Sequence, residues 1–229
     1  MDMIADKLAQ VRARIAAACA GAKRDVRSVT LLAVGKTQPA DALRAAFDSG
    51  ATRFGENYVQ EGLAKIDALA DLRCAIEWHL IGPLQANKTR SVAEQFDWVH
   101  SIDRLRIAQR LSEQRPAQLA PLQVCLQVNI DAQTSKSGVD PVALPELAHA
   151  IVTLPGLRLR GLMAIPAPAR DLAKQRAPHR ELRELFERLR ADGLELDTLS
   201  MGMSDDLEAA IAEGSTLVRV GSAIFGARG

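Results

Sequence analysis

The feature that most constrains this fold is an alternation of short apolar runs with longer helical patterns, which repeats along the whole chain. Strands that alternate with helices pair in parallel, and the helices cover the sheet. Eight such units fit a closed (β/α)₈ barrel of the TIM type, at the short end of its usual length, and a doubly wound open sheet is the alternative. The predicted strands cover residues 29–34, 52–54, 76–81, 98–100, 122–130, 157–164, 196–200 and 216–220.

The chain also begins with a helical pattern. Ile4, Leu8, Val11 and Ile15 recur at the spacing of an amphipathic helix, which we expect over residues 1–20, packed on the barrel. The βα units leave little of the 229 residues for another domain, so a single domain over residues 1–229 is expected. The other predicted helices cover residues 39–49, 58–69, 87–95, 104–114, 141–153, 170–191 and 205–213.

Composition and charge exclude several functional classes. Lysines and arginines number 29 against 28 acidic residues, so no overall field favours nucleic acid or an anionic membrane. No apolar run approaches the roughly 18 residues of a membrane span. Cys19, Cys74 and Cys125 are far apart and form no CxxC pair, so neither a disulfide framework nor a zinc site is indicated. These features predict a cytoplasmic protein that needs no metal and binds neither nucleic acid nor membrane.

A lysine stands at the end of the first predicted strand. Lys36 follows an apolar run at residues 31–34 that is typical of a strand buried on both faces, so its amine is expected in a poorly hydrated place. Burial favours the neutral amine, which is the form that attacks an aldehyde. Lys88, at a helix start, and Lys136, in a polar loop, lack this apolar approach. A solvated lysine at a strand end is the alternative interpretation of Lys36.

Glycine and serine residues gather after the last two predicted strands, where the loops of such barrels often bind phosphate. Gly202 and Ser204 follow the seventh strand, and Gly221 and Ser222 follow the eighth. Glycine lets backbone N–H groups approach an anion, serine adds a hydroxyl donor, and a helix beginning near Asp205 would direct its positive end to the same place. The sequence thus indicates a phosphate site, with a simple pair of turns as the alternative. The P-loop and GxGxxG patterns are absent.

Two polar residues interrupt the predicted strands. Arg219 lies in the apolar stretch LVRV, and a buried arginine keeps its proton and needs an acceptor. That acceptor is either a structural carboxylate or a ring nitrogen of a bound cofactor. His79, in the stretch EWHLIG, is either a core histidine with satisfied hydrogen bonds or a cofactor contact.

With these residues in view, the sequence resembles the pyridoxal phosphate homeostasis proteins, the YggS/PROSC group, along nearly its whole length. The motifs that carry the resemblance are AVGKTQP, RFGENYVQE, EWHLIGPLQANK, SIDR, TSKSG, LRGLMAIP, SMGMSDDLEAAI and VRVGSAIFG. The resemblance implies a fold-type III barrel similar to the N-terminal domain of alanine racemase, with pyridoxal 5′-phosphate (PLP) held as a Schiff base on Lys36. It further implies that Arg219 faces the pyridine nitrogen. The other implied cofactor contacts are Ser204, Ser222, Gly202 and Gly221 at the phosphate, and Asn57, His79 and Met201 elsewhere near the cofactor.

The resemblance also bears on activity. Alanine racemases need a second domain that supplies a tyrosine acid/base, whereas no such domain is expected after residue 229 and the one tyrosine is Tyr58. An arginine that donates to the pyridine nitrogen keeps that nitrogen unprotonated, which weakens the ring as an electron sink. We therefore expect a monomeric carrier in PLP homeostasis, without robust turnover, with PLP-dependent apoenzymes as candidate recipients. The alternatives are a slow racemase that uses Lys36 as one base and a cofactor-free Schiff-base aldolase. Gly35 is a further departure, because relatives commonly carry serine there.

Overall fold

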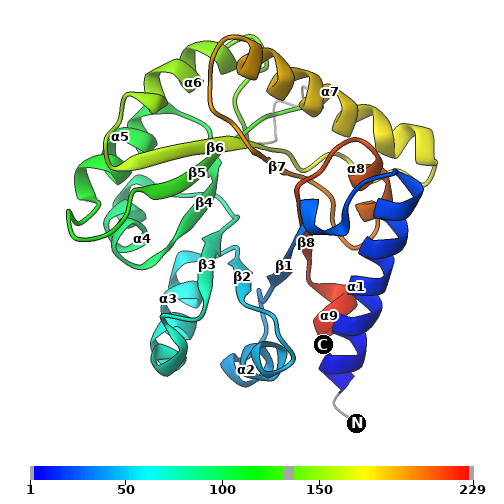
Figure 1. The fold of residues 1–229 in the computed structure, drawn as a ribbon. Helices are drawn as coiled ribbons and strands as arrows, with labels where there is room; N and C mark the ends of the chain where they lie inside the picture. The colour runs from blue at the N-terminus through cyan, green and yellow to red at the C-terminus, as the bar shows by residue number, and fades with distance from the viewer. Residues whose placement is uncertain (1–2, 132–136, 227–229) are drawn as a thin grey trace.

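The computed structural model describes residues 3–131 and 137–226, and within these residues eight parallel strands close into a barrel (Figure 1). The strands follow one another around the barrel in chain order, and β1 (Thr30–Val34) pairs with β8 (Leu217–Val220). This closing pair confirms the predicted barrel and excludes the open sheet. The remaining strands are β2 (Arg53–Glu56), β3 (Glu77–Leu80), β4 (Trp98–Ile102), β5 (Leu122–Gln127), β6 (Leu157–Met163) and β7 (Thr198–Ser200).

The apolar runs locate every described strand; most predicted bounds differ from the observed ones by one or two residues, and the end of β5 differs by three. β5 ends at Gln127, whereas the pattern predicted a strand as far as residue 130. Val128 forms an isolated bridge with Val139 and donates from its backbone to the carbonyl of Met163 over 2.8 Å, and Val128 and Ile130 are both buried. The apolar pattern therefore continues with burial past Gln127, where the regular pairing of β5 with β6 ends.

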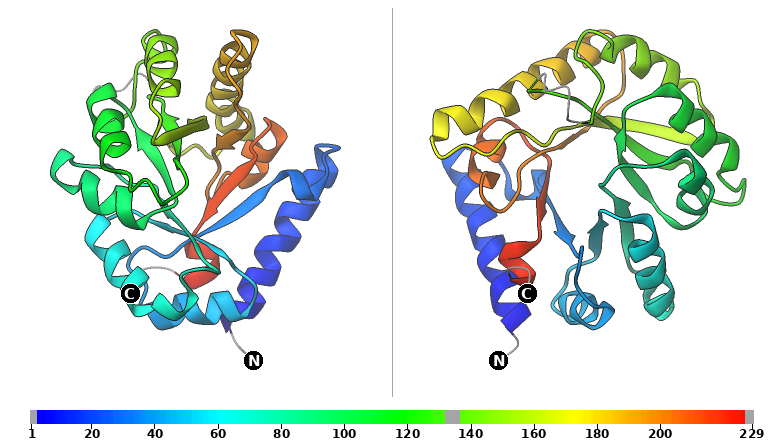
Figure 2. Two further views of the ribbon diagram at one scale, coloured as in Figure 1. Left: turned by 60° about the vertical axis from the view of Figure 1, so that its left-hand side comes forward. Right: turned by 180° about the vertical axis from the view of Figure 1, so that it is seen from behind.

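Helices connect successive strands and cover the outside of the barrel (Figures 1 and 2). α6 begins at Leu144, three residues later than the pattern predicted, because Asp140 accepts a hydrogen bond from the backbone of Val142 and forms a turn there. The helices between strands are α2 (Ala40–Asp48), α3 (Val59–Ala68), α4 (Thr89–Gln95), α5 (Leu105–Gln114), α6 (Leu144–Val152), α7 (Leu172–Ala191) and α8 (Leu207–Ala212). Short 3₁₀ segments lie at Val26–Ser28, Ala70–Leu72 and Ala86–Lys88.

The first and last helices lie side by side at the barrel closure. α1 (Met3–Gly21) packs against α8 and α9 (Ser222–Phe225), and both views in Figure 2 place α1 beside α9. Leu8, Val11 and Ile15 of the predicted apolar stripe are buried, and so is Cys19, whereas Ile4 is only partly buried. The short helix α9 was not predicted. None of the helices in the described part of the chain is long and apolar enough to cross a membrane.

The inside of the barrel is separated from the main core. Ala33 belongs to the large apolar cluster between strands and helices, so the alternation along a strand puts Leu32 and Val34 on the inner side. Those two side chains form a small separate cluster with Ile81 and Leu217. Another separate apolar cluster consists of Trp98, Cys125 and Met163. The polar residues His79, His100, Ser200 and Arg219 are buried as well and are linked by hydrogen bonds.

Candidate functional site

A cavity of about 460 Å³ opens at the carboxyl ends of the strands, which we call the C-terminal mouth. Its lining comes from the segments after β1, β2, β3, β6, β7 and β8, so residues far apart in sequence meet there. This volume suits a small organic ligand. Six of the nine predicted cofactor contacts line it: Lys36, Asn57, Ser204, Arg219, Gly221 and Ser222.

Lys36 lies in a turn just beyond β1 and lines the cavity. The turn is closed by the backbone N–H of Gln38, which donates to the carbonyl of Gly35 over 2.9 Å. Lys36 is exposed, so the expectation of a poorly hydrated amine is wrong. The physical reason is that the buried run ends at Gly35, and the next residue already belongs to the open rim of the barrel.

The predicted phosphate corner brings two serine hydroxyls together. Ser222 Oγ donates to Ser204 Oγ over 3.1 Å. Gly221 is needed beside them, because a Cβ there would lie 2.9 Å from the carbonyl oxygen of Val34 on the neighbouring strand. Arg14 of α1 donates to the Ser204 carbonyl over 2.9 Å and thereby ties the loop to the first helix. The corner thus has hydroxyl donors in a loop fixed from two sides.

Helix dipoles contribute less to this corner than the sequence suggested. α8 begins at Leu207 and has 6 residues, and α9 has 4, so neither offers a long row of aligned peptide dipoles. Asp206 instead shapes the loop: it accepts from the backbone of Met203 over 2.6 Å and from His179 over 3.0 Å. Burial raises the pKa of Asp206, but the hydrogen bonds from His179 and Met203 outweigh it and hold the pKa below its ordinary value.

Arg219 is 3% exposed, and its guanidinium reaches the cavity from the barrel interior. It donates to the carbonyl of Ser200 over 2.5 Å, to the Ser200 hydroxyl over 2.8 Å and to the carbonyl of Ala164 over 2.8 Å. Burial lowers its pKa to about 10, so it stays charged at neutral pH. All these partners are neutral, and within the described residues no carboxylate pairs with it. The structural carboxylate considered for Arg219 is therefore not what the structure shows.

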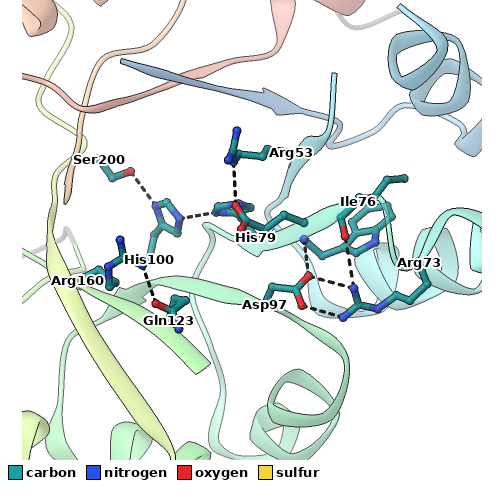
Figure 3. A network of polar contacts seen from close by, with 11 residues as sticks. Arg53, Arg73, Ile76, His79, Asp97, His100, Gln123, Arg160 and Ser200 are labelled. Atoms are coloured by element: carbon teal, nitrogen blue, oxygen red, sulfur yellow. Dashed lines mark hydrogen bonds and ion pairs between the residues drawn. The ribbon is translucent and has the colours of Figure 1, made fainter. Parts of the chain in front are cut away.

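His79 lies deeper in the barrel and does not line the cavity. It is fully buried, with Nε2 2.9 Å from Glu77 Oε1 and Nδ1 2.9 Å from His100 Nε2, and His100 Nδ1 lies 2.8 Å from the Ser200 hydroxyl (Figure 3). The prediction of a direct cofactor contact is therefore disfavoured for His79, and the alternative of a satisfied core histidine describes its surroundings. It reaches the mouth only through His100, Ser200 and Arg219.

The direction of the hydrogen bonds from Glu77 through His79 and His100 to Ser200 follows from the Glu77 carboxylate, which can only accept. Burial lowers the pKa of His79 and holds the pKa of His100 well below its ordinary value, so both rings are neutral at pH 7. Glu77 only accepts, so His79 donates to it, His100 donates to His79, and Ser200 donates to His100. The lone pairs of Ser200 then face Arg219, which only donates. The assignment is consistent from both ends.

The remaining predicted contacts are placed less directly. Met201 is buried in the core cluster between strands and helices, and Gly202 contributes its carbonyl, which accepts from the backbone of Arg219 over 2.9 Å. Neither lines the cavity. Lys136 lies outside the described residues. Sequence reasoning also missed Glu61 and Lys65, which contact the Lys36 turn from α3. Their i, i+4 spacing on a predicted helix reads as a surface ion pair, so only the tertiary packing reveals them.

The closed parallel barrel, with a lysine and a pair of serines at its C-terminal mouth, defines the class of fold: residues 7–229 match the family model of the alanine racemase N-terminal domain. The chain is 60% identical over 228 residues to the pyridoxal phosphate homeostasis protein of Pseudomonas aeruginosa, covering 100% of this chain and 97% of that protein. The chain belongs to the family of pyridoxal phosphate homeostasis proteins.

Solved structures agree with this assignment. The structure of PipY from Synechococcus elongatus with PLP bound is 38% identical, has a TM-score of 0.85, and covers 97% of this chain and 100% of that one. Alanine racemase from Corynebacterium glutamicum is 19% identical with a TM-score of 0.72, over 100% of this chain and 62% of that one, and this likeness concerns the fold alone.

Proposed function

We propose that this protein binds PLP at the C-terminal mouth and takes part in PLP homeostasis, with Lys36 as its point of covalent attachment. The observation that carries the proposal is the convergence on one cavity of Lys36, Arg219 and the pair Ser204 and Ser222. When bound, PLP supplies an aldehyde that condenses with a lysine amine to a Schiff base and releases water. The homeostasis proteins of the family and the PLP-bound PipY structure support this choice of ligand.

The residues present fit that group. Arg219 is a buried cation whose protein partners are all neutral, so an unprotonated ring nitrogen would give it an acceptor. Ser204 and Ser222 offer hydroxyl donors to a phosphate in a loop that Arg14 and Asp206 fix. Because Lys36 is exposed at the rim, an incoming aldehyde can reach its amine from solvent.

We further propose that the protein holds PLP without robust turnover. Arg219 can only donate, so it favours an unprotonated pyridine nitrogen and a weak electron sink. Racemisation also needs a second acid/base. Among the described lining residues, the titratable side chains besides Lys36 and Arg219 reduce to Asp205, which neighbours Ser204 at the corner proposed for phosphate. Tyr58 is 64% exposed and does not line the cavity.

The experiment is a spectrum followed by peptide mapping. On adding PLP to the purified protein we expect a visible absorption band that borohydride bleaches, with the reduced adduct mapped to Lys36. The matched control is Lys88→Ala, which removes a lysine outside the cavity and should change nothing. A protein that stays colourless with PLP, or an adduct mapped to Lys136 in place of Lys36, would overturn the proposal.

Three wider expectations belong with this proposal. Residues 1–229 act as one PLP-binding domain that works as a monomer in the cytoplasm. PLP-dependent apoenzymes are the proposed recipients of the cofactor, which suits an attachment lysine that solvent can reach. Incubation with L-alanine should give no appreciable D-alanine, and rapid racemisation would favour the enzyme alternative.

A further inference from the structure

A second lysine lies buried directly behind the turn that carries Lys36. The side chain of Lys65, on α3, is 6% exposed. Its ammonium donates to the carbonyl of Gly35 over 2.6 Å, to Glu56 Oε1 over 2.8 Å and to Glu61 Oε1 over 2.7 Å. An ammonium has three donors, so all of them are used. One of the acceptors is the backbone immediately before Lys36.

The turn itself is strained at Thr37. Gly35, Lys36, Thr37 and Gln38 form a four-residue turn, with Lys36 and Thr37 at its centre. Thr37 has a φ of 65°, a left-handed conformation that glycine normally supplies at this position of a turn and that is unfavourable for a β-branched residue. Such strain persists only where the surroundings over-determine it, and it gathers at functional sites.

Glu61 links the strained residue to the buried lysine. Its Oε1 accepts from the Lys65 ammonium and also, in a short hydrogen bond, from the backbone N–H of Thr37. Glu61 and Lys65 lie one turn apart on α3, so a single helix presents both groups. Together they bind the chain on both sides of Lys36, at Gly35 and at Thr37.

Glu56, from β2, completes the cluster and explains the glycine at position 35. Glu56 is fully buried, and burial raises its pKa to about 7 against the lowering effect of Lys65. A Cβ at residue 35 would lie 2.7 Å from Glu56 Oε1 and 2.9 Å from Leu43 Cδ1. Because glycine has no Cβ, Gly35 lets Glu56 and Leu43 pack directly against the turn.

We propose that Lys65, Glu61 and Glu56 form a positioning cluster that holds the Lys36 turn in its strained conformation and so presents the Lys36 amine to the ligand aldehyde. The inference rests on the proposed function, because it concerns the reactivity of Lys36 toward PLP. Lys65 is not itself the reacting amine, since it is buried and all its donors are taken. The cluster should govern how fast Lys36 reacts and leave the phosphate contacts after β7 and β8 unchanged.

The test separates reaction from binding by mixing ligand-free protein rapidly with PLP. The readouts are the limiting rate of adduct formation at saturating PLP and the concentration dependence that reports the initial complex. For Lys65→Met we expect the limiting rate to fall about tenfold, a size typical of lost backbone strain, with the initial complex unchanged. The control is Glu213→Gln, which alters a carboxylate that is 1% exposed and accepts from Arg176 and Arg180 away from the cavity.

Two further variants distinguish positioning from general stability. Glu61→Ala removes the acceptor of the Thr37 backbone on a partly exposed side chain and should slow the reaction, whereas Asp67→Ala, exposed on the same helix, should not. Adding Thr37→Gly to Lys65→Met should restore most of the rate, because glycine adopts the positive φ without the cluster. A loss of stability alone would not be rescued in this way.

The outcomes keep the two proposals apart. If wild-type protein forms no adduct on Lys36, the proposed function fails. If wild-type protein forms the adduct while Lys65→Met and Glu61→Ala react at the wild-type rate, the positioning cluster is refuted and the function stands. Should Lys65→Met fail to fold, Glu61→Ala and its rescue by Thr37→Gly decide the matter alone.

Discussion

The two mouths of the barrel use arginine in opposite ways. At the N-terminal mouth, a hollow of about 360 Å³, Arg53 pairs with Glu77 over 3.0 Å and Arg160 pairs with Asp197 over 2.5 Å. At the C-terminal mouth, Arg219 donates only to neutral oxygens of the described residues. An arginine that has its own carboxylate needs no ligand, whereas the hydrogen-bond partners of Arg219 are neutral and Asp206 acts on its charge through space alone. The lack of a carboxylate hydrogen-bonded to Arg219 among the described residues, more than the size of the hollow, distinguishes the end that we propose binds PLP.

A row of hydrogen-bonded side chains inside the barrel connects these two ends. Figure 3 shows it from Arg53 through His79 and His100 to Ser200. Glu77 joins Arg53 to His79, and Arg219 follows Ser200 at the other end. His79, His100 and Ser200 between the charged ends are neutral. The Glu77 carboxylate forms an ion pair with Arg53 and does not neutralise Arg219. One hydrogen-bond network thus reaches both mouths, while each arginine has a different kind of direct partner.

Removing Lys36 is expected to give the largest effect, confined to the C-terminal mouth. Lys36→Ala should abolish the borohydride-trapped adduct while noncovalent PLP binding remains, because Ser204, Ser222 and Arg219 are still present. Equilibrium dialysis measures the remaining affinity, and mass spectrometry measures the adduct. Loss of all binding would contradict the division of labour between the lysine and the phosphate corner.

Substituting one charged residue at each mouth sharpens the comparison. Arg219→Met should weaken PLP binding by about tenfold or more, as for a lost charged hydrogen bond. The stability of the ligand-free protein should change little, since removal of a buried charge that has no carboxylate hydrogen-bonded to it offsets the lost hydrogen bonds. Asp197→Ala should lower the free energy of unfolding by about 1 kcal/mol, because it breaks a partly exposed ion pair, and should leave PLP binding unchanged.

Urea unfolding and PLP titration measure both properties on the same samples. The reverse pattern, with Asp197→Ala losing affinity and Arg219→Met losing only stability, would place the ligand at the N-terminal mouth.

The pH dependence of stability tests the hydrogen-bonded row inside the barrel, through His100. Burial holds the pKa of His100 well below 6.5, so below pH 6.5 the unfolded chain takes up a proton that the folded protein does not. Stability should therefore fall as the pH drops from 6.5, by up to about 1.4 kcal/mol per pH unit for this residue. In His100→Gln the fall should be shallower by that amount.

Glu56 acts with the opposite sign and must be accounted for in that measurement. Its pKa is raised to about 7, so the folded protein binds its proton more tightly and stability falls as pH rises from about 4.5 to 7. This contribution is common to wild type and His100→Gln, and it cancels in the difference of their pH slopes. Equal slopes in urea melts at pH 5 and 6.5 would show that His100 is not held neutral in the fold.

Sequence patterns predicted the barrel well because each of its strands carries its own signal. An apolar run bounded by polar turns is local, and it places β1 and β8 within a residue or so of their observed starts. The meeting of Ser204 and Ser222 could also be predicted from the sequence, because the barrel topology alone brings the ends of the last two strands together. These parts of the site follow from rules that act along the chain.

Other parts of the site depend on side-chain exposure and on tertiary contacts, which a local sequence pattern does not predict. The exposure of Lys36 depends on where the buried run stops, and an apolar approach does not reveal whether the next residue is inside or on the rim. The neutral partners of Arg219 are the hydroxyl of Ser200 and two backbone carbonyls, one in β7 and one after β6, and any sequence would offer the carbonyls. Lys65 resembles an ordinary helix-surface lysine until the fold brings α3 beside the turn at Gly35, just beyond β1.

The pairing of β1 with β8 joins the beginning of the barrel to its end, from Thr30 beside Leu217 to Ala33 beside Val220. Lys36 stands just past one side of this seam, and Ser222 just past the other. A molecule bound to both Lys36 and Ser222 would connect the end of β1 to the end of β8, across the strand pair that closes the barrel. Loading the protein should therefore resist the parting of its first and last strands, and release of the cargo should be easiest when that seam loosens.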